Sequence, residues 1–240
     1  MTLDRLLSLE ITYGPAFMQW FLGVTLVCCC EIWLTIRLLK RYAPNPQPTE
    51  VMPFSVADFV TLGRGVLVAC VAGFIFLPKP SGLYGWLPGS LYLIAVLADY
   101  VDGYLARLHD SASEFGAALD RNFDAIITFI GSLLGILYGH LPLWYLSVGL
   151  AFYVFSCAAW IMKKTGREVF DLPSSNYRRI VGGSNALFIG LTLTPALPVR
   201  WLSVLSPLFT FLILTGFFRD WFSISGIKTK LLNSKTHSKI

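Results

Sequence analysis

The chain has 240 residues, of which 55% are hydrophobic and only 14% are charged, and its mean hydropathy is +0.63. A soluble domain carries roughly 25% charged residues, so this composition excludes an ordinary soluble enzyme and also a disordered chain. The formal net charge is +5, but the basic residues collect in alternate predicted loops and no nucleic-acid-binding motif is visible, so we expect no nucleic-acid partner.

Long apolar segments, each near the ~20 residues that cross a bilayer as a helix, follow one another along the chain. In chain order they cover residues 17–39, 54–77, 86–108, 115–138, 141–162, 180–197 and 201–222. The sequence therefore predicts an all-α, polytopic membrane helix bundle embedded in the lipid bilayer.

The stretch before residue 17 lacks the basic start and the small-residue cleavage site of a removable signal, so we expect segment 17–39 to remain as a membrane helix. An extended linker follows, because four prolines interrupt it: Pro44, Pro46, Pro48 and Pro53. We predict three parts, which are an N-terminal segment 1–53 with this extra helix, a six-helix domain 54–223, and a basic tail 224–240.

Lysines and arginines are unevenly divided between the two predicted sides of the membrane. One side holds Arg37, Lys40, Arg41, Arg107, Arg121, Lys163, Lys164, Arg167, Arg178, Arg179, Arg219, Lys228, Lys230, Lys235 and Lys239. The other side holds only Arg5, Lys79 and Arg200. Because basic loops face the cytoplasm, we expect a multi-pass protein with a cytoplasmic C-terminus and the N-terminus outside.

Two pairs of aspartates lie at the cytoplasmic ends of the third and fourth predicted helices. Asp99 and Asp102 are three residues apart and Asp120 and Asp124 are four apart, so each pair shares one helix face. The connection 108–115 is short, which makes the two helices antiparallel neighbours whose carboxylates converge on one cavity. Intramembrane carboxylates are costly and normally have a partner and a function. Hard oxygen ligands suit Mg²⁺, Mn²⁺ or Ca²⁺, so the pattern predicts a site for two divalent cations.

Small residues occur in register with these aspartates. Gly103, Ala106 and Gly116 have little or no side chain, which allows a flat base or a phosphate to approach the helix backbone. Helix packing in the membrane is the alternative reason for small residues. Arg107 has three readings, which are a phosphate contact, an ion pair with the aspartates, or a side chain that reaches toward the membrane surface.

The pattern Asp-x2-Asp-Gly-x2-Ala-Arg-x8-Gly-x3-Asp-x3-Asp resembles the signature of the CDP-alcohol phosphotransferase family. All eight fixed positions are present, at Asp99, Asp102, Gly103, Ala106, Arg107, Gly116, Asp120 and Asp124. The signature itself covers only residues 99–124. The family core has six membrane helices, which residues 54–222 supply. Family members commonly start with a short surface helix, whereas segment 17–39 is apolar enough to be an added transmembrane helix.

The resemblance implies a transfer reaction in which a CDP-linked lipid donor, most often CDP-diacylglycerol, passes its substituted phosphoryl group to an alcohol and releases CMP. It implies that two cations, Mg²⁺ or Mn²⁺, are held by Asp99, Asp102, Asp120 and Asp124. Asp124 is also implied as the general base, although spacing alone allows these roles to permute. The small residues and Arg107 would then contact the nucleotide, and the family resemblance implies a homodimer.

A weaker element of the same family lies upstream, where members carry Asn-x2-Thr-x2-Arg. Thr61 and Arg64 match it and share one helix face, while Asp58 replaces the asparagine. By resemblance, Thr61 and Arg64 help to hold the diphosphate of the donor. The alternative is that Arg64 is a charge that only marks membrane topology.

The acceptor is less well defined by the sequence. A phosphorylated acceptor such as glycerol 3-phosphate requires cationic groups near the cavity, and Arg178 and Arg179 are the candidates. Their alternative reading is the positive-inside pattern or contact with anionic lipid. Other acceptors, a CDP-choline or CDP-ethanolamine transferase, a cation transporter that uses intramembrane aspartates, and an inactive scaffold stay open as alternatives.

Overall fold

The computed structural model describes residues 3–42, 56–108, 114–167, 170 and 175–225, with side chains in 14–42, 60–101, 114–167, 170 and 175–225. Within these residues the chain forms helices and no strand: α1 (Leu3–Tyr42), α2 (Val56–Gly73), α3 (Leu87–Leu108), α4 (Glu114–Leu137), α5 (Leu146–Lys164), α6 (Asn176–Thr192) and α7 (Val199–Ile224). Short 3-10 helices occur at Phe74–Phe76, Gly82–Trp86 and Leu143–Tyr145. The predicted all-α fold is confirmed, and a helix overlaps each predicted apolar segment.

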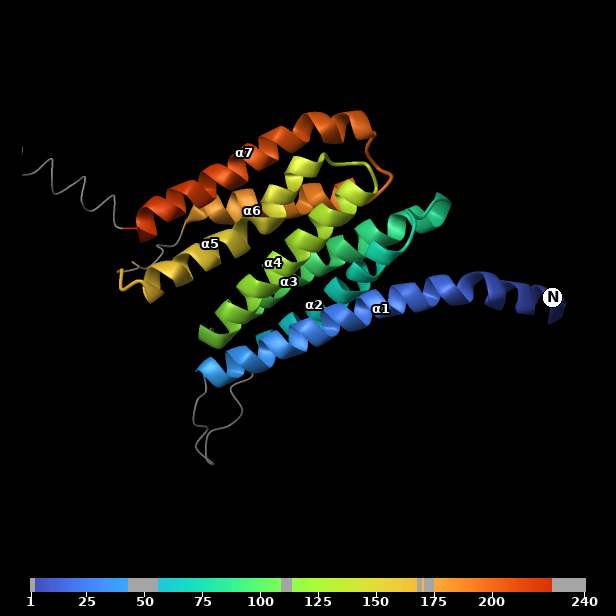
Figure 1. Cartoon of the computed structure of the whole chain (residues 1–240), viewed down its shortest axis with the longest axis horizontal. Coiled ribbons are helices and arrows are strands. Elements are labelled where there is room, and N and C mark those ends of the chain that lie inside the picture. The colour runs from blue at the N-terminus through green and yellow to red at the C-terminus, as the bar shows by residue number, and fades with distance from the viewer. Residues whose placement is uncertain (1–2, 43–55, 109–113, 168–169, 171–174, 226–240) are drawn as a thin grey trace, which may run out of the picture.

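The helices run alternately up and down along the long direction of the bundle (Figure 1). The end of α1, the start of α2, the end of α3 and the start of α4 therefore lie together at one end of the bundle, and so do the end of α5, the start of α6 and the end of α7 (Figure 1). Helix α1 packs against α2 and α4, on the opposite side of the bundle from α7. This arrangement brings the acidic end of α3 beside the acidic start of α4.

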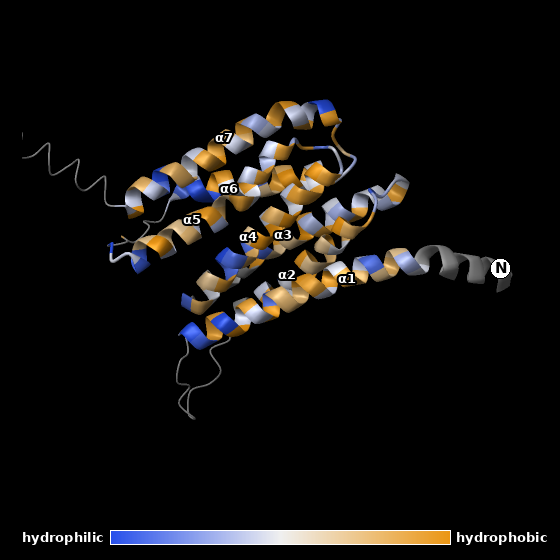
Figure 2. Cartoon of the chain, viewed as in Figure 1, coloured by the Kyte–Doolittle hydropathy of each residue, from blue (hydrophilic) through white to orange (hydrophobic). Residues whose placement is uncertain are grey.

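Three apolar stretches are long enough to cross a membrane by themselves, namely Gly14–Tyr42, Leu143–Lys164 and Val199–Ile224. Figure 2 shows apolar residues along the middle of the helices and hydrophilic residues gathered where α1 and α5 end and α4 begins. An integral membrane protein is therefore confirmed. The predicted division into six core spans plus one added span stays a prediction.

The core lies where α3, α4 and α6 cross closely. Tyr92 and Ile189 are fully buried there, on either side of Gly131. A side chain at Gly131 would lie 2.5 Å from a carbon atom of each of these neighbours, so the contact requires glycine at this position. A second apolar cluster, which includes Leu38, Leu119 and others, joins α1 to α4. These contacts hold the acid-bearing ends of the helices in fixed register.

The first helix begins earlier than the predicted segment 17–39, at Leu3, and the sixth, which was placed at 180–197, lies at Asn176–Thr192. Its apolar run continues past Thr192, but Pro195 and Pro198 cannot continue a helix, so the helix ends earlier. The helix also starts earlier than predicted. Arg178 and Arg179, which the sequence assigned to a loop, therefore belong to its first turn. The two arginines are therefore fixed to a helix beside the cavity described below.

Candidate active site

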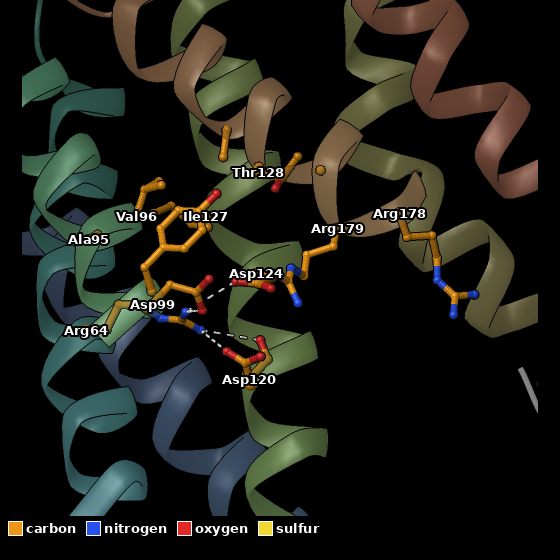
Figure 3. A pocket seen from close by; sticks show the side chains of 14 residues that line it. Arg64, Ala95, Val96, Asp99, Asp120, Asp124, Ile127, Thr128, Arg178 and Arg179 are labelled. Carbon is orange, nitrogen blue, oxygen red and sulfur yellow. Dashed lines mark hydrogen bonds and ion pairs between the residues drawn. The ribbon is translucent and has the colours of Figure 1, made fainter. Parts of the chain in front are cut away.

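Arg64 is the centre of a group of charged side chains at the crossing of α2, α3 and α4. Its side chain is only 1% exposed, which is unusual for a charged residue inside an apolar bundle. The guanidinium forms an ion pair with Asp99, donates to Asp120 Oδ1 at 2.8 Å, and lies 3.3 Å from Asp124 Oδ1 (Figure 3). It also donates to the backbone carbonyl of Asp120 at 3.4 Å. A buried arginine is stable only when its charge is compensated, and three carboxylates supply that compensation.

The three carboxylates come from two helices and meet at one place, as the sequence predicted. One oxygen atom from each of Asp99, Asp120 and Asp124 lies within 4.8 Å of the other two. The carboxylates are partly open, with side-chain exposures of 32%, 38% and 50% in that order. They therefore face a cavity that solutes can enter, while Arg64 lies beneath them.

The cavity has a volume of about 430 Å³ and lies between α3, α4 and α6. Besides the charged group it is lined by Ala95, Val96, Tyr100, Ile127, Thr128, Arg178, Arg179, Gly182, Gly183 and Ala186. Its end away from the aspartates is mostly apolar. At Gly183 a Cβ atom would lie within 2.3 Å of the Tyr100 hydroxyl oxygen, so the glycine permits α6 to approach α3 closely.

The two arginines of α6 face different surroundings. Arg178 forms an ion pair with the buried Asp220 of α7 at 2.9 Å, and Figure 3 shows its guanidinium turned away from the aspartates. Arg219 lies 3.5 Å from the same carboxylate. Arg179 is exposed and extends toward Asp124 (Figure 3). The structure therefore separates two residues that the sequence treated alike.

Several other predicted site residues are placed less fully. Helix α3 continues through Asp102, Gly103, Ala106 and Arg107, but their side chains lie outside the described part of the chain, as does that of Asp58. Gly116 lies in the first turn of α4 and is partly exposed. Thr61 is buried on α2, one turn before Arg64, and is not among the described residues that line the cavity.

Sequence reasoning missed two buried acids, Glu31 and Asp220. Glu31 lies in α1 and is 6% exposed, and Asp220 lies in α7 and is also 6% exposed. A single carboxylate inside an otherwise apolar stretch was a signal in both cases, for the reason already applied to the four aspartates. The partner of Asp220, Arg178, lies 42 positions away in the sequence and gave no local pattern.

The donor set suits a hard divalent cation. Asp99, Asp120 and Asp124 offer carboxylate oxygens in one group, with no sulfur or imidazole ligand among the described residues of that group. Mg²⁺ and Mn²⁺ prefer such oxygen ligands, and their charge offsets the repulsion between neighbouring carboxylates. The residues present therefore fit the cations that the resemblance implies.

A protein-family comparison agrees with the fold and the site. The model of the family described as CDP-alcohol phosphatidyltransferase matches residues 54–217, which include the aspartates, Arg64 and both arginines of α6. The chain therefore belongs to the CDP-alcohol phosphatidyltransferase family, a family of transferases of phosphate-containing groups. The resemblance drawn from the signature is thereby confirmed.

Several curated relatives carry one name, CDP-diacylglycerol–glycerol-3-phosphate 3-phosphatidyltransferase. The protein of Salmonella choleraesuis (strain SC-B67) is 30% identical over 86 residues, which are 35% of this chain and 44% of the relative. That of Wigglesworthia glossinidia brevipalpis is 33% identical over 89 residues, 37% of this chain and 48% of the relative. That of Cereibacter sphaeroides is 34% identical over 80 residues, 33% of this chain and 35% of the relative. The chain thus matches less than half the length of each of these relatives.

Proposed function

We propose that this protein transfers a phosphatidyl group from CDP-diacylglycerol to an alcohol, with release of CMP. The observation that carries the proposal is the meeting of Asp99, Asp120 and Asp124 around Arg64 at an open cavity. Family membership and the names of the relatives support the same reaction. An apolar bundle also suits a lipid donor, whose acyl chains remain in the bilayer while its nucleotide reaches the cavity.

In this proposal Asp99, Asp102, Asp120 and Asp124 hold two divalent cations, Mg²⁺ or Mn²⁺. When bound, the cations supply positive charge that stabilises the transferring phosphoryl group and the departing CMP. The protein itself removes the proton from the acceptor hydroxyl. Asp124 accepts it from the acceptor hydroxyl, whose oxygen then forms a bond to the β-phosphorus while the bond from that phosphorus to the CMP oxygen breaks.

Arg64 is proposed to bind the diphosphate of the donor. Its guanidinium is planar, always charged and already oriented by its carboxylate partners, which suits phosphate oxygens. Thr61 lies one turn away on the same helix and is proposed to support this contact. Gly103, Ala106, Arg107 and Gly116 are proposed to accommodate the cytidine nucleotide by the same family resemblance.

The proposed acceptor is glycerol 3-phosphate, in line with the relatives' names. The phosphate of this acceptor requires a positively charged side chain that is exposed to the cavity and is not fully neutralised by another ion pair. Arg179 extends toward Asp124, so a phosphate bound to it would place a hydroxyl near the proposed base (Figure 3). Arg178 is proposed to contribute mainly through position, because its charge is shared with Asp220.

The decisive experiment measures CMP release from CDP-diacylglycerol by the purified protein with Mn²⁺ or Mg²⁺. A panel of acceptors, including glycerol 3-phosphate, serine and myo-inositol 1-phosphate, identifies the alcohol, and diacylglycerol with CDP-choline or CDP-ethanolamine tests the alternative donors. We expect release with glycerol 3-phosphate. Absence of CMP release with every pair, together with cation flux in proteoliposomes, would instead support the transporter.

A further inference from the structure

Glu31 is a buried acid of α1 that the proposed reaction does not use. Its residue exposure is 6%, and its Oε1 atom is buried without a hydrogen-bond partner among the described residues. The Thr35 hydroxyl, one turn further on, donates to the Glu31 backbone carbonyl at 2.7 Å and so does not satisfy the carboxyl group. A buried carboxyl oxygen without a hydrogen bond is costly, so a charged neighbour is the expected reason for the presence of Glu31.

The carboxyl group of Glu31 lies against the helix that carries Arg64. A Cβ atom built on Gly65 would lie 3.0 Å from Glu31 Oε2 and 2.8 Å from a ring carbon of Phe123. Glu31 therefore packs onto the backbone of α2 at the residue next to Arg64, and glycine at position 65 makes room for it.

The two residues lie at similar depth in the bundle. Glu31 lies eleven residues before the end of α1 at Tyr42, and Arg64 lies eight residues after the start of α2 at Val56. At 1.5 Å per residue these are about 16 and 12 Å from helix ends that meet at the same end of the bundle (Figure 1). In an apolar region at this depth, a carboxylate and a guanidinium influence each other strongly.

Arg64 interacts with the same three carboxylates that could hold a divalent cation. It interacts with Asp99, Asp120 and Asp124 at once, so its positive charge competes with any cation that approaches them. A negative charge on α1 reduces this competition, because it offsets the charge of Arg64 without occupying the aspartates.

We propose that Glu31 is a positioning residue, the counter-ion through which α1 compensates Arg64 and leaves the three aspartates able to bind divalent cations. The proposal rests on the cation site of the proposed function. It assigns α1, which lies outside the segment matched by the family model, a direct influence on that site.

The test measures Mn²⁺ binding to the purified full chain without substrates. Binding is detected as loss of the electron paramagnetic resonance signal of the free ion. Glu31→Gln preserves shape and removes charge, and it is expected to weaken Mn²⁺ binding roughly tenfold. Glu31→Asp retains the charge and is expected to stay within about threefold of the unmodified protein. Thr35→Val, on the same buried face, is the matched control and is expected to bind Mn²⁺ normally.

A double-mutant cycle shows whether Glu31 acts through Arg64. In an Arg64→Gln background, Glu31→Gln is expected to change Mn²⁺ affinity by less than about twofold, because the charge to be offset has been removed. Equal affinity of Glu31→Gln and the unmodified protein overturns the proposal and leaves the proposed function intact. So does a lower thermal midpoint with unchanged Mn²⁺ affinity, which marks a structural role alone. Absence of Mn²⁺ binding by the unmodified protein overturns the cation site itself.

Discussion

Asp124 differs from its two neighbours in the group by being the most available carboxylate. Its side chain is 50% exposed, and its contact with Arg64 is 3.3 Å, compared with 2.8 Å for Asp120. A general base must reach the hydroxyl proton of an incoming substrate, and an exposed, loosely paired carboxylate meets that requirement best. The geometry therefore supports the base role that the resemblance implied for Asp124.

Asp124→Asn is expected to lower kcat by at least about 100-fold, because the amide cannot accept the proton. Donor affinity is expected to change much less, since Arg64 and the other carboxylates remain. The measurement is CMP release, combined with direct binding of the donor. Glu114→Gln, on the exposed first turn of the same helix, is the control and should retain normal turnover. A near-normal rate for Asp124→Asn would show that another group is the base.

Arg179→Gln and Arg178→Gln are expected to have different effects. Removing Arg179 should raise KM for a phosphorylated acceptor about tenfold with a smaller change in kcat, since it loses one charge-assisted contact. Removing Arg178 leaves the buried Asp220 with a weaker partner, so we expect a loss of about 1–3 kcal/mol of folding stability. Acceptor kinetics and thermal unfolding in detergent separate the two. A similar pattern for both variants would argue against their division of roles.

The aspartate group was predictable from the sequence, because helix periodicity and one short connection determine it. Asp120 and Asp124 lie on one face of α4, and the antiparallel α3 brings Asp99 beside them. Contacts between helices distant in sequence were not predictable in this way. Nothing local indicates that Arg64 lies beneath Asp99, 35 positions away. Glu31 was overlooked because one acid hardly changes the average hydropathy of a long apolar segment.

At the scale of helices, close crossings determine the shape of the cavity. Gly131 of α4 lies between Tyr92 of α3 and Ile189 of α6, and both neighbours are fully buried. Gly190 of α6 similarly faces Leu93, whose Cδ2 atom would be 2.3 Å from an added Cβ. These crossings lie beyond the apolar end of the cavity, so they hold α6 and its arginines near the aspartates.

Gly131→Ala is expected to destabilise the protein by about 1–3 kcal/mol, because buried neighbours on two helices must move to admit the methyl group. Gly63→Ala is the matched control, since Gly63 lies in a helix with nothing within 4 Å of an added Cβ. It should be neutral or stabilising by up to about 1 kcal/mol, because alanine favours helix. Thermal unfolding of both variants in one detergent provides the comparison. Equal stability of Gly131→Ala and the parent would mean that the crossing is looser than described.

At the scale of the whole molecule, a polar cluster closes the end of the bundle opposite the aspartates. Lys79 donates to His140 Nε2 at 2.6 Å, and His140 Nδ1 donates to the backbone carbonyl of Thr192. The cluster joins the connection after α2, the turn after α4 and the end of α6. His140 is therefore neutral in this arrangement, with each ring nitrogen in a defined role.

Burial, together with the nearby Lys79, lowers the pKa of His140 below its usual value of about 6.5, although the bond to Thr192 opposes the shift. The unfolded chain therefore binds a proton first, so stability is retained above pH about 6.5 and falls as the pH is lowered toward the folded pKa. Thermal midpoints between pH 7.5 and 5.5 should show this loss, and His140→Gln should reduce it. His237→Gln is the control. An unchanged pH profile for His140→Gln would contradict this role.

The predicted orientation concerns the whole molecule too. The aspartates lie near the bundle end where α7 ends, and the basic loops predict that this end faces the cytoplasm. A fluorescent protein that folds only in the cytoplasm should therefore fluoresce when fused to the C-terminus, and alkaline phosphatase at the same point should be inactive. The reverse result would invert the topology. The implied homodimer and the division into residues 1–53, 54–223 and 224–240 stay predictions.

Arg64 also bears on how such a protein is made. A chain with several carboxylates in its membrane segments would be difficult to assemble if it had to capture scarce metal ions first. Because one of its own side chains already neutralises part of that negative charge, the helices can associate during biosynthesis and acquire ions afterwards. A shortage of divalent cations would then leave a folded but inactive protein in the membrane, which becomes active again when the ions bind.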